Sequence, residues 1–207
     1  MRLYHFLSDK YGEEALRKRR LKVSIINQLN DPFEFQAGFL NPTCQLRDTF
    51  RKFKDVISAE FGILCFSKQW SNPLLWSHYS EKHTGIALGF DVSKEALQVN
   101  YSKNRPLFTW HKIPNDSKLT QSYFKKLIKT KFLSWEHEEE FRLFYDLNEL
   151  DRENRLYFQP FDDNLILKEV IAGCKTELSD NDFLGLLEGY NSVTAIKSED
   201  ILFLVEN

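Results

Sequence analysis

The sequence has little glycine, proline or cysteine. Its 207 residues include 8 Gly, 6 Pro and 3 Cys, which excludes collagen-like and low-complexity chains. The three cysteines are far apart and form no C-x-x-C pair, so neither a disulfide framework nor a cysteine-rich zinc site is expected. No apolar run approaches the roughly 20 residues of a membrane span, and the first residues turn polar too soon for a signal peptide. We therefore expect a cytoplasmic protein that makes no membrane contact.

Aromatic residues are abundant instead. The chain contains 18 Phe, 8 Tyr and 4 Trp, while its hydrophobic share of 42% and charged share of 28% are ordinary for a globular protein. A chain of this length can bury well over half of its unfolded surface, so it needs no disulfide or metal to fold. With no linker-like stretch in the sequence, we expect a single domain over residues 1–207.

Short helices alternate irregularly with many short strands in the hydrophobic pattern. Strands are expected at residues 2–6, 21–26, 61–67, 84–92, 97–102, 139–147, 155–161, 167–173 and 201–205, and helices at 13–20, 46–59, 72–83, 117–132 and 179–190. Because the pattern lacks a steady strand–helix–strand alternation, it favours an α+β fold over a doubly wound α/β fold. We expect a split, curved, mixed sheet with short flanking helices.

The charge is unevenly distributed along the chain. The net charge is −2, yet residues 101–131 carry 8 Lys or Arg against 1 Asp. Such a basic segment can attract the phosphates of a nucleotide or a nucleic acid. An equally good interpretation is the solvated face of an amphipathic helix, because apolar residues recur at helical spacing within it.

Two clusters of polar residues stand in otherwise apolar segments. His5 lies on the first expected strand, where a histidine is more often a hydrogen-bonded core residue than a catalyst. Trp76, Tyr79 and His83 fall on one face of the expected helix. That face is either part of the core or a stacking wall for a planar ring, since each side chain carries a polar group that burial must satisfy.

The turn N-D-P-F-E forms a third cluster. Asn30 and Asp31 suit the bracing of a turn, and Glu34 follows the proline. We expect these three residues to support a site from behind rather than to contact a ligand.

The segment F-L-S-W-E-H-E-E-E-F-R-L-F-Y is the most informative. On a continuous strand, Glu138, Glu140 and Arg142 point to one face. Charged side chains on an apolar strand are costly to bury unless they are paired or used. We expect Arg142 to neutralise one carboxylate and to leave the other available as a base or as an acceptor for a sugar hydroxyl. The alternative is a solvent-facing strand edge.

These motifs resemble the domain of unknown function 2971 family. The resemblance rests on L-Y-H-F, N-D-P-F-E, W-S-H-Y with a later H-x-G, and W-x-x-E-x-E-x-R, and it runs from residue 3 to about residue 175. The family occurs in bacteria and is largely uncharacterised, so the resemblance supplies no reaction.

A more distant similarity joins the chain to ADP-ribosyltransferases of the diphtheria-toxin type. By that resemblance, His5 would hold a ribose of NAD, Tyr79 would stack on nicotinamide, and Glu140 would bond a ribose hydroxyl and stabilise an oxocarbenium-like transition state. Glu138 would be the second polar group two residues earlier. Ser67, Trp76 and Arg142 complete the set expected to contact NAD. The sequence departs from that type where a second tyrosine is usual, since this region contains Phe90.

Two classes of function follow. The first is an NAD-dependent ADP-ribosyltransferase-like enzyme with a protein or nucleic-acid acceptor, acting in bacterial phage defence or a toxin system. The second is a non-catalytic module that binds a nucleotide or a nucleic acid. A metal-dependent hydrolase ranks below both, because the sequence has no H-x-x-x-H motif, no D-x-D pair joins its candidate residues Asp31, Glu34, Glu138 and Glu140, and no metal is expected. The oligomeric state is left open.

Overall fold

The computed structural model describes residues 1–31, 35, 38–39, 43–108 and 125–197. The strands are β1 (Arg2–Leu7), β2 (Arg20–Ile25), β3 (Gly38–Phe39), β4 (Phe61–Ser67), β5 (Ile86–Val92), β6 (Leu97–Gln98), β7 (Asn100–Ser102), β8 (Leu107–Phe108), β9 (Thr130–Phe132), β10 (Glu140–Asp146), β11 (Asp151–Glu153), β12 (Leu156–Pro160), β13 (Leu165–Ala172) and β14 (Thr194–Lys197). The α-helices are α1 (Asp9–Lys18), α2 (Cys44–Glu60), α3 (Pro73–Tyr79) and α5 (Asp180–Gly185), and the 3₁₀ helices are η1 (Ile26–Gln28), η3 (Leu133–Glu138) and η4 (Leu147–Glu149).

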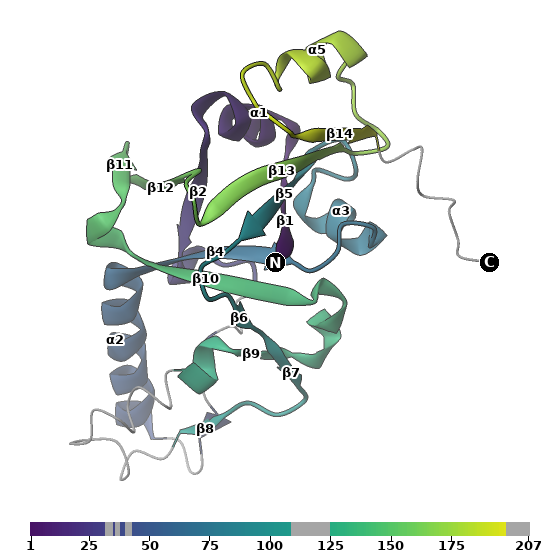
Figure 1. Cartoon of the computed structure of the whole chain (residues 1–207). Helices are drawn as coiled ribbons and strands as arrows, with labels where there is room; N and C mark the ends of the chain where they lie inside the picture. The colour runs from purple at the N-terminus through teal and green to yellow at the C-terminus, as the bar shows by residue number, and fades with distance from the viewer. Residues whose placement is uncertain (32–34, 36–37, 40–42, 109–124, 198–207) are drawn as a thin grey trace.

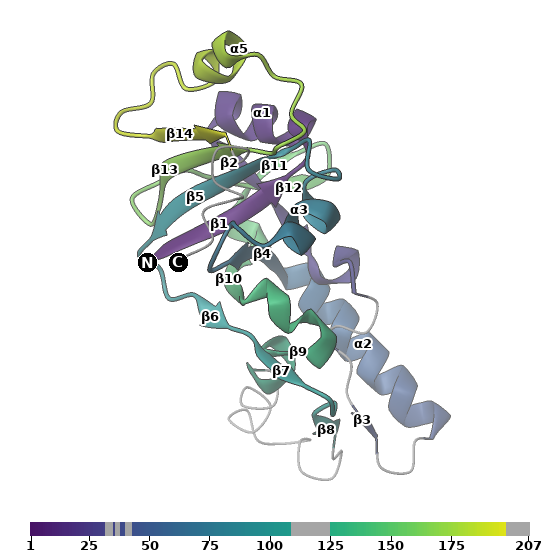
Figure 2. The same ribbon diagram turned by 90° about the vertical axis from the view of Figure 1, so that its right-hand side faces the viewer.

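A mixed sheet dominates the described part of the chain (Figure 1). Its main path runs β11-β12-β2-β4-β1-β5-β13-β14, and β10 and β6 extend from the other edge of β4. The β13–β14 pair is parallel, whereas β1, β4, β5, β10 and β13 pair antiparallel to one another. Helices α1 and α3 flank the sheet, and α2 extends away from it (Figure 2). The fold is α+β, as the hydrophobic pattern predicts.

The sheet forks along one edge of β4. On its other edge, β4 pairs with β10 along its whole length, from Ser67↔Glu140 to Phe61↔Asp146. On the forked edge it pairs with β2 at residues 62–63 and with β1 at Ser67. Between these contacts β1 leaves to follow β5, and β2 leaves to follow β12. The fork therefore opens a space between β1 and β2, with β4 along its side.

Packing on either side fixes this fork. A Cβ atom at Gly62 would collide with Val23 and Leu147, so glycine permits the close approach of β2 to β4. Buried Leu3, Phe66 and Phe90 belong to the main core cluster beside the fork. Phe66 and Phe90 meet edge to face with ring centroids 6.2 Å apart, within the range of about 4.5–7 Å that is typical of aromatic pairs. Val23 of β2 belongs to the same cluster, so one core holds both branches of the fork.

Several boundaries differ from the sequence-based predictions. The expected strand at 97–102 is divided into β6, which pairs with β10, and β7, which pairs with β9. Helix α3 ends at Tyr79, because Glu81, Lys82 and His83 adopt positive φ angles of 48°, 57° and 76°. Of the expected helix at 117–132, residues 117–124 lie outside the described residues, residues 125–128 are helical, and Thr130–Phe132 is a strand. The strand predicted at 201–205 lies outside the described residues.

None of the described helices is both long enough and apolar enough to cross a membrane.

Candidate functional site

A cavity of about 210 Å³ occupies the fork of the sheet. Strand β1 supplies Tyr4, His5 and Phe6 to its lining, and the forked edge of β4 supplies Ile63, Cys65, Phe66 and Ser67. The end of β2 and the following turn, helix α3, and the segment that joins β9 to β10 close the other sides. Segments from most of the chain's length thus meet at one cavity.

Most of the side chains singled out in the sequence line this cavity. They are His5, Asn30, Asp31, Ser67, Tyr79, Glu138 and Glu140. Asn30 and Asp31 lie on its wall rather than behind it, so the supporting position expected for them is corrected. Glu34 lies outside the described residues.

Trp76 is placed in the core rather than on the cavity wall. Its side chain is 2% exposed, and its indole N–H donates to the Trp70 carbonyl at 2.6 Å. The ring meets Phe6 edge to face at 5.2 Å, so it supports a residue that lines the cavity. His83 is beyond the end of α3. The shared helical face expected for Trp76, Tyr79 and His83 is therefore wrong, because the helix ends before His83 and Trp76 faces the sheet.

The His5 side chain bonds the backbone of β4 at the fork, next to the point where β1 and β4 pair. Its Nδ1 is 2.7 Å from the carbonyl oxygen of Cys65. A carbonyl can only accept, so Nδ1 carries the proton and Nε2 of the neutral ring is an acceptor. Burial lowers the pKa of His5, partly opposed by this hydrogen bond. The cavity therefore has a neutral imidazole in a defined tautomer at its β1 side.

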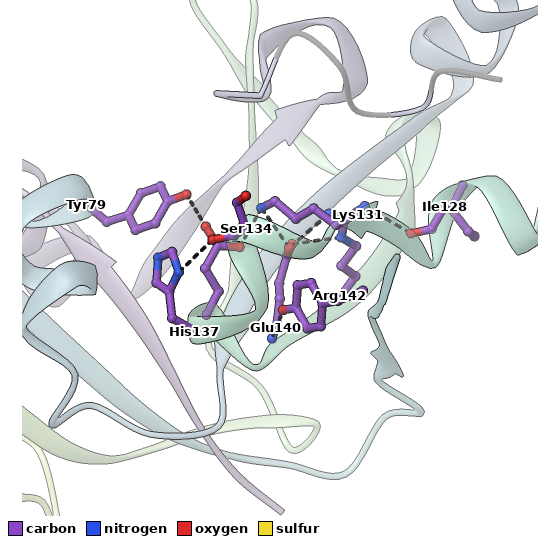
Figure 3. A network of polar contacts seen from close by, with 9 residues as sticks. Tyr79, Ile128, Lys131, Ser134, His137, Glu140 and Arg142 are labelled. Atoms are coloured by element: carbon purple, nitrogen blue, oxygen red, sulfur yellow. Dashed lines mark hydrogen bonds and ion pairs between the residues drawn. The ribbon is translucent and has the colours of Figure 1, made fainter. Parts of the chain in front are cut away.

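Glu140 is held by two cations inside the protein (Figure 3). Arg142 donates to both of its oxygens, from Nε at 2.7 Å and from Nη2 at 2.9 Å, and Lys131 donates from Nζ at 3.0 Å. A third donor of Arg142, Nη1, bonds the Ile128 carbonyl at 3.0 Å. The backbone N–H of Glu140 donates to the Tyr101 hydroxyl at 2.8 Å. Arg142 is 1% exposed, so it acts behind Glu140 and is not among the cavity-lining residues.

Glu138 reaches the same place from a different element. It ends η3, and Glu139 then adopts a left-handed conformation with φ of 43° before β10 begins. The continuous strand expected through Glu138 is therefore wrong, although Glu140 and Arg142 do share a strand face. The Tyr79 hydroxyl donates to one oxygen of Glu138 at 2.5 Å, and Lys131 donates to the other at 2.5 Å.

The two carboxyl groups have opposite pKa shifts. Burial raises the pKa of Glu138, and this outweighs the opposing charge of Lys131. Burial would also raise the pKa of Glu140, but the charges of Arg142 and Lys131 lower it to about 2. Glu140 thus stabilises the fold above its unfolded-state pKa, and this contribution is lost as the pH falls toward about 2. Burial and the Glu138 charge raise the pKa of Tyr79, which stays a neutral donor.

Lys131 is a functional candidate that the sequence-based reasoning missed. The sequence pattern places it among the lysines of a basic helix, but β9 brings it to the cavity wall, where it is 7% exposed. Its Nζ bridges Glu138 and Glu140. The space between the carboxylates, where a metal-dependent hydrolase would hold a cation, is therefore filled by an ammonium group. Within the described ranges, no group of three or more His, Cys, Asp or Glu side chains is arranged to hold a metal ion.

Replacing Lys131 by methionine is expected to raise the pKa of Glu138 further. The substitution removes a positive charge 2.5 Å from this carboxylate while keeping a side chain of similar length. An NMR titration of ¹³C-labelled glutamate carboxyls measures the shift. Lys129→Met, outside the cavity lining, is the control and should leave this resonance unchanged. An unchanged Glu138 pKa in Lys131→Met would show that the ammonium does not govern its protonation.

Comparison with known proteins supports one family resemblance. Residues 75–143 match the model of a family described as protein of unknown function (DUF2971). The match extends from α3 into β10 and includes Tyr79, Lys131, Glu138 and Glu140, which form the polar wall of the cavity. Neither the curated proteins nor the solved structures contain a match to the chain.

Proposed function

We propose that the cavity binds the nicotinamide riboside end of NAD and that the protein breaks the bond between nicotinamide and ribose. One observation carries this proposal: two buried carboxyl groups meet at one cavity with pKa values shifted in opposite directions. Paired carboxyl groups in unequal environments are typical of enzymes that cleave glycosidic bonds, where positive charge develops on the sugar ring.

The contacts favour different roles for the two carboxylates. Glu140 is neutralised by Arg142 and Lys131 and holds the network together. Glu138 lines the cavity as Glu140 does, but the ion pair found for it among the described residues is with Lys131, and no arginine is paired with it there. We therefore assign to Glu138 the role nearest to the reacting sugar, which the resemblance to diphtheria-toxin-type ADP-ribosyltransferases would give to Glu140. This division follows the expectation that Arg142 neutralises one carboxylate and leaves the other available.

Each remaining group has a chemical task in this proposal. As the N-glycosidic bond breaks, its electron pair leaves with nicotinamide. Tyr79 and Lys131 donate hydrogen bonds to Glu138 and thereby favour its ionised form against the effect of burial. The carboxylate then stabilises the positive charge that develops on the ribose. Nε2 of His5 accepts a hydrogen bond from a ribose hydroxyl. Tyr79 packs its ring against nicotinamide while its hydroxyl donates to Glu138. A nucleophile then bonds to the anomeric carbon and releases its proton.

The direct test is incubation of the pure protein with NAD. We expect free nicotinamide to accumulate, measured by liquid chromatography, and ADP-ribose to appear when water is the acceptor. Addition of bacterial lysate tests transfer to a protein or a nucleic acid, as phage defence would require. Absence of both NAD binding and nicotinamide release, with and without lysate, would contradict the proposal.

Tyr79→Ala is expected to weaken NAD binding by about 5- to 150-fold. Stacking of a ring on an aromatic side chain is worth about 1–3 kcal/mol, and this range corresponds to that change in Kd. Tyr79→Phe keeps the ring and loses only the hydroxyl that bonds Glu138, so its affinity should stay near that of the wild type. Isothermal titration of NAD into each variant makes the comparison. Equal losses in both variants would show that the ring makes no stacking contact.

A binding module without turnover is the second candidate. It is favoured by the hydrogen bonds that both oxygens of Glu138 and of Glu140 already make within the protein. In that case the pure protein binds NAD or another nucleotide, and no nicotinamide is released under any acceptor condition.

A further inference from the structure

Three aromatic rings form a cluster beside the cavity. The ring cluster consists of His78 from α3 and of Trp135 and His137 from η3. Its ring centroids are 5.9 Å apart for His78–Trp135, 6.0 Å for Trp135–His137 and 6.3 Å for His78–His137. His78 is exposed and the other two are half-buried. None of the three belongs to the hydrophobic core clusters found among the described residues.

The ring cluster is continuous with the cavity wall. The ring of His78 is 6.2 Å from that of Tyr79, and His137 directly precedes Glu138. Figure 3 shows Tyr79 and His137 at the same end of the polar network. Asn72 donates to the His137 carbonyl at 3.0 Å and thereby ties η3 to the start of α3. The cluster therefore keeps a fixed position relative to Glu138.

The size of the cavity requires a second contact surface for a dinucleotide. Pockets that enclose a drug-sized ligand usually measure about 300–1,000 Å³, whereas this cavity measures about 210 Å³. A ribose and one small ring fill such a space, and the remainder of NAD must lie outside it. Exposed aromatic rings bind a nucleobase by stacking. Lys131, with Nζ 5.1 Å from the Trp135 ring centroid, adds a positive charge on the side where the ring cluster meets the cavity.

We infer that the ring cluster is the stacking site for the adenine base of NAD. This inference rests on the proposed function, which places the nicotinamide end in the cavity. The substrate class is then a dinucleotide: the cavity takes the end that reacts, and the ring cluster takes the end that only binds. Nicotinamide mononucleotide then contacts the cavity alone, and AMP contacts the ring cluster alone.

Trp135→Ala tests the inference with three ligands. We expect Kd to rise about tenfold for NAD and for AMP, which is about 1.4 kcal/mol of lost stacking, and to change less than twofold for nicotinamide mononucleotide. Trp135→Phe keeps an aromatic ring and should retain most of the affinity. Quenching of Trp135 fluorescence by AMP in the wild type, lost in Trp135→Phe, reports stacking without any turnover.

Two further variants protect the test against a folding defect. His78→Ala removes an exposed ring on α3. It should weaken the binding of AMP and of NAD, as Trp135→Ala does. Phe132→Ala is the matched control, because Phe132 is 51% exposed and lies outside both the ring cluster and the cavity lining. Circular dichroism confirms that each variant is folded before titration.

The outcomes separate this inference from the proposed function. If the wild type binds NAD and nicotinamide mononucleotide, and Trp135→Ala and His78→Ala bind both equally well, the stacking site is overturned. The proposed function then still stands. Binding of AMP that depends on Trp135, with no binding of nicotinamide mononucleotide, would overturn the proposed function but support an adenine site. Failure of all three ligands to bind the wild type would overturn both.

Discussion

Replacing Glu140 by glutamine is expected to lower the free energy of unfolding by about 3–5 kcal/mol, the usual cost of removing one partner from a buried ion pair. Arg142 is 1% exposed and makes two of its hydrogen bonds to Glu140. Without the carboxylate, the guanidinium would remain in the interior with an amide as its partner. Urea unfolding followed by circular dichroism measures the change.

Two comparisons show whether the loss comes from the buried charge. Glu139→Gln alters an exposed carboxylate one residue away and should change stability by less than about 0.5 kcal/mol. The double variant Glu140→Gln with Arg142→Met removes both charges of the pair, so we expect it to be more stable than Glu140→Gln alone. A Glu140→Gln protein as stable as the wild type would contradict the buried network.

The second large effect is expected on catalysis. Glu138→Gln should slow nicotinamide release by about 100- to 1,000-fold, since the loss of one well-placed electrostatic group costs about 2.7–4 kcal/mol in the transition state. The amide keeps the size of the side chain and removes the charge that faces the ribose. NAD affinity should change little, because the charge acts mainly once the bond begins to break.

The contrast with the neighbouring carboxylates makes this prediction specific. Single-turnover measurement of nicotinamide release separates the chemical step from NAD binding. Glu139→Gln should turn over at the wild-type rate. If Glu138→Gln releases nicotinamide as fast as the wild type, Glu138 is not the carboxylate that faces the reacting sugar.

Local periodicity predicted the longer strands of the main sheet, such as β1, β4, β5 and β10, and one side of the site, whereas it missed β9. Alternation along β10 places Glu140 and Arg142 on one face and Phe141 and Leu143 on the other, and the latter two lie in the core. Glu138 joins Glu140 by another route, because the left-handed turn at Glu139 brings the end of η3 next to the strand. A two-residue alternation cannot foresee such a turn, since it depends on one backbone conformation.

The fork, the position of Lys131 and the contact of Trp76 could not be predicted from the sequence, because each depends on pairing or packing between distant segments. The fork depends on where β1 and β2 leave β4, and no local pattern states which strands become neighbours. The same limit applies to Lys131, which resembles its solvated neighbours in sequence but is carried into the cavity by β9. For Trp76, the helical spacing marks an aromatic face, but only the packed sheet decides that this face meets Phe6.

The most direct test of the central claim is a time course of nicotinamide formation from NAD by the pure wild-type protein, run in parallel with Glu138→Gln. The claim is that the fork of the sheet holds a carboxylate able to support cleavage of a glycosidic bond. It predicts steady release of nicotinamide by the wild type and release about 100- to 1,000-fold slower by Glu138→Gln. A wild type that binds NAD and releases no nicotinamide with any acceptor, or two proteins that release it at the same rate, would contradict the claim.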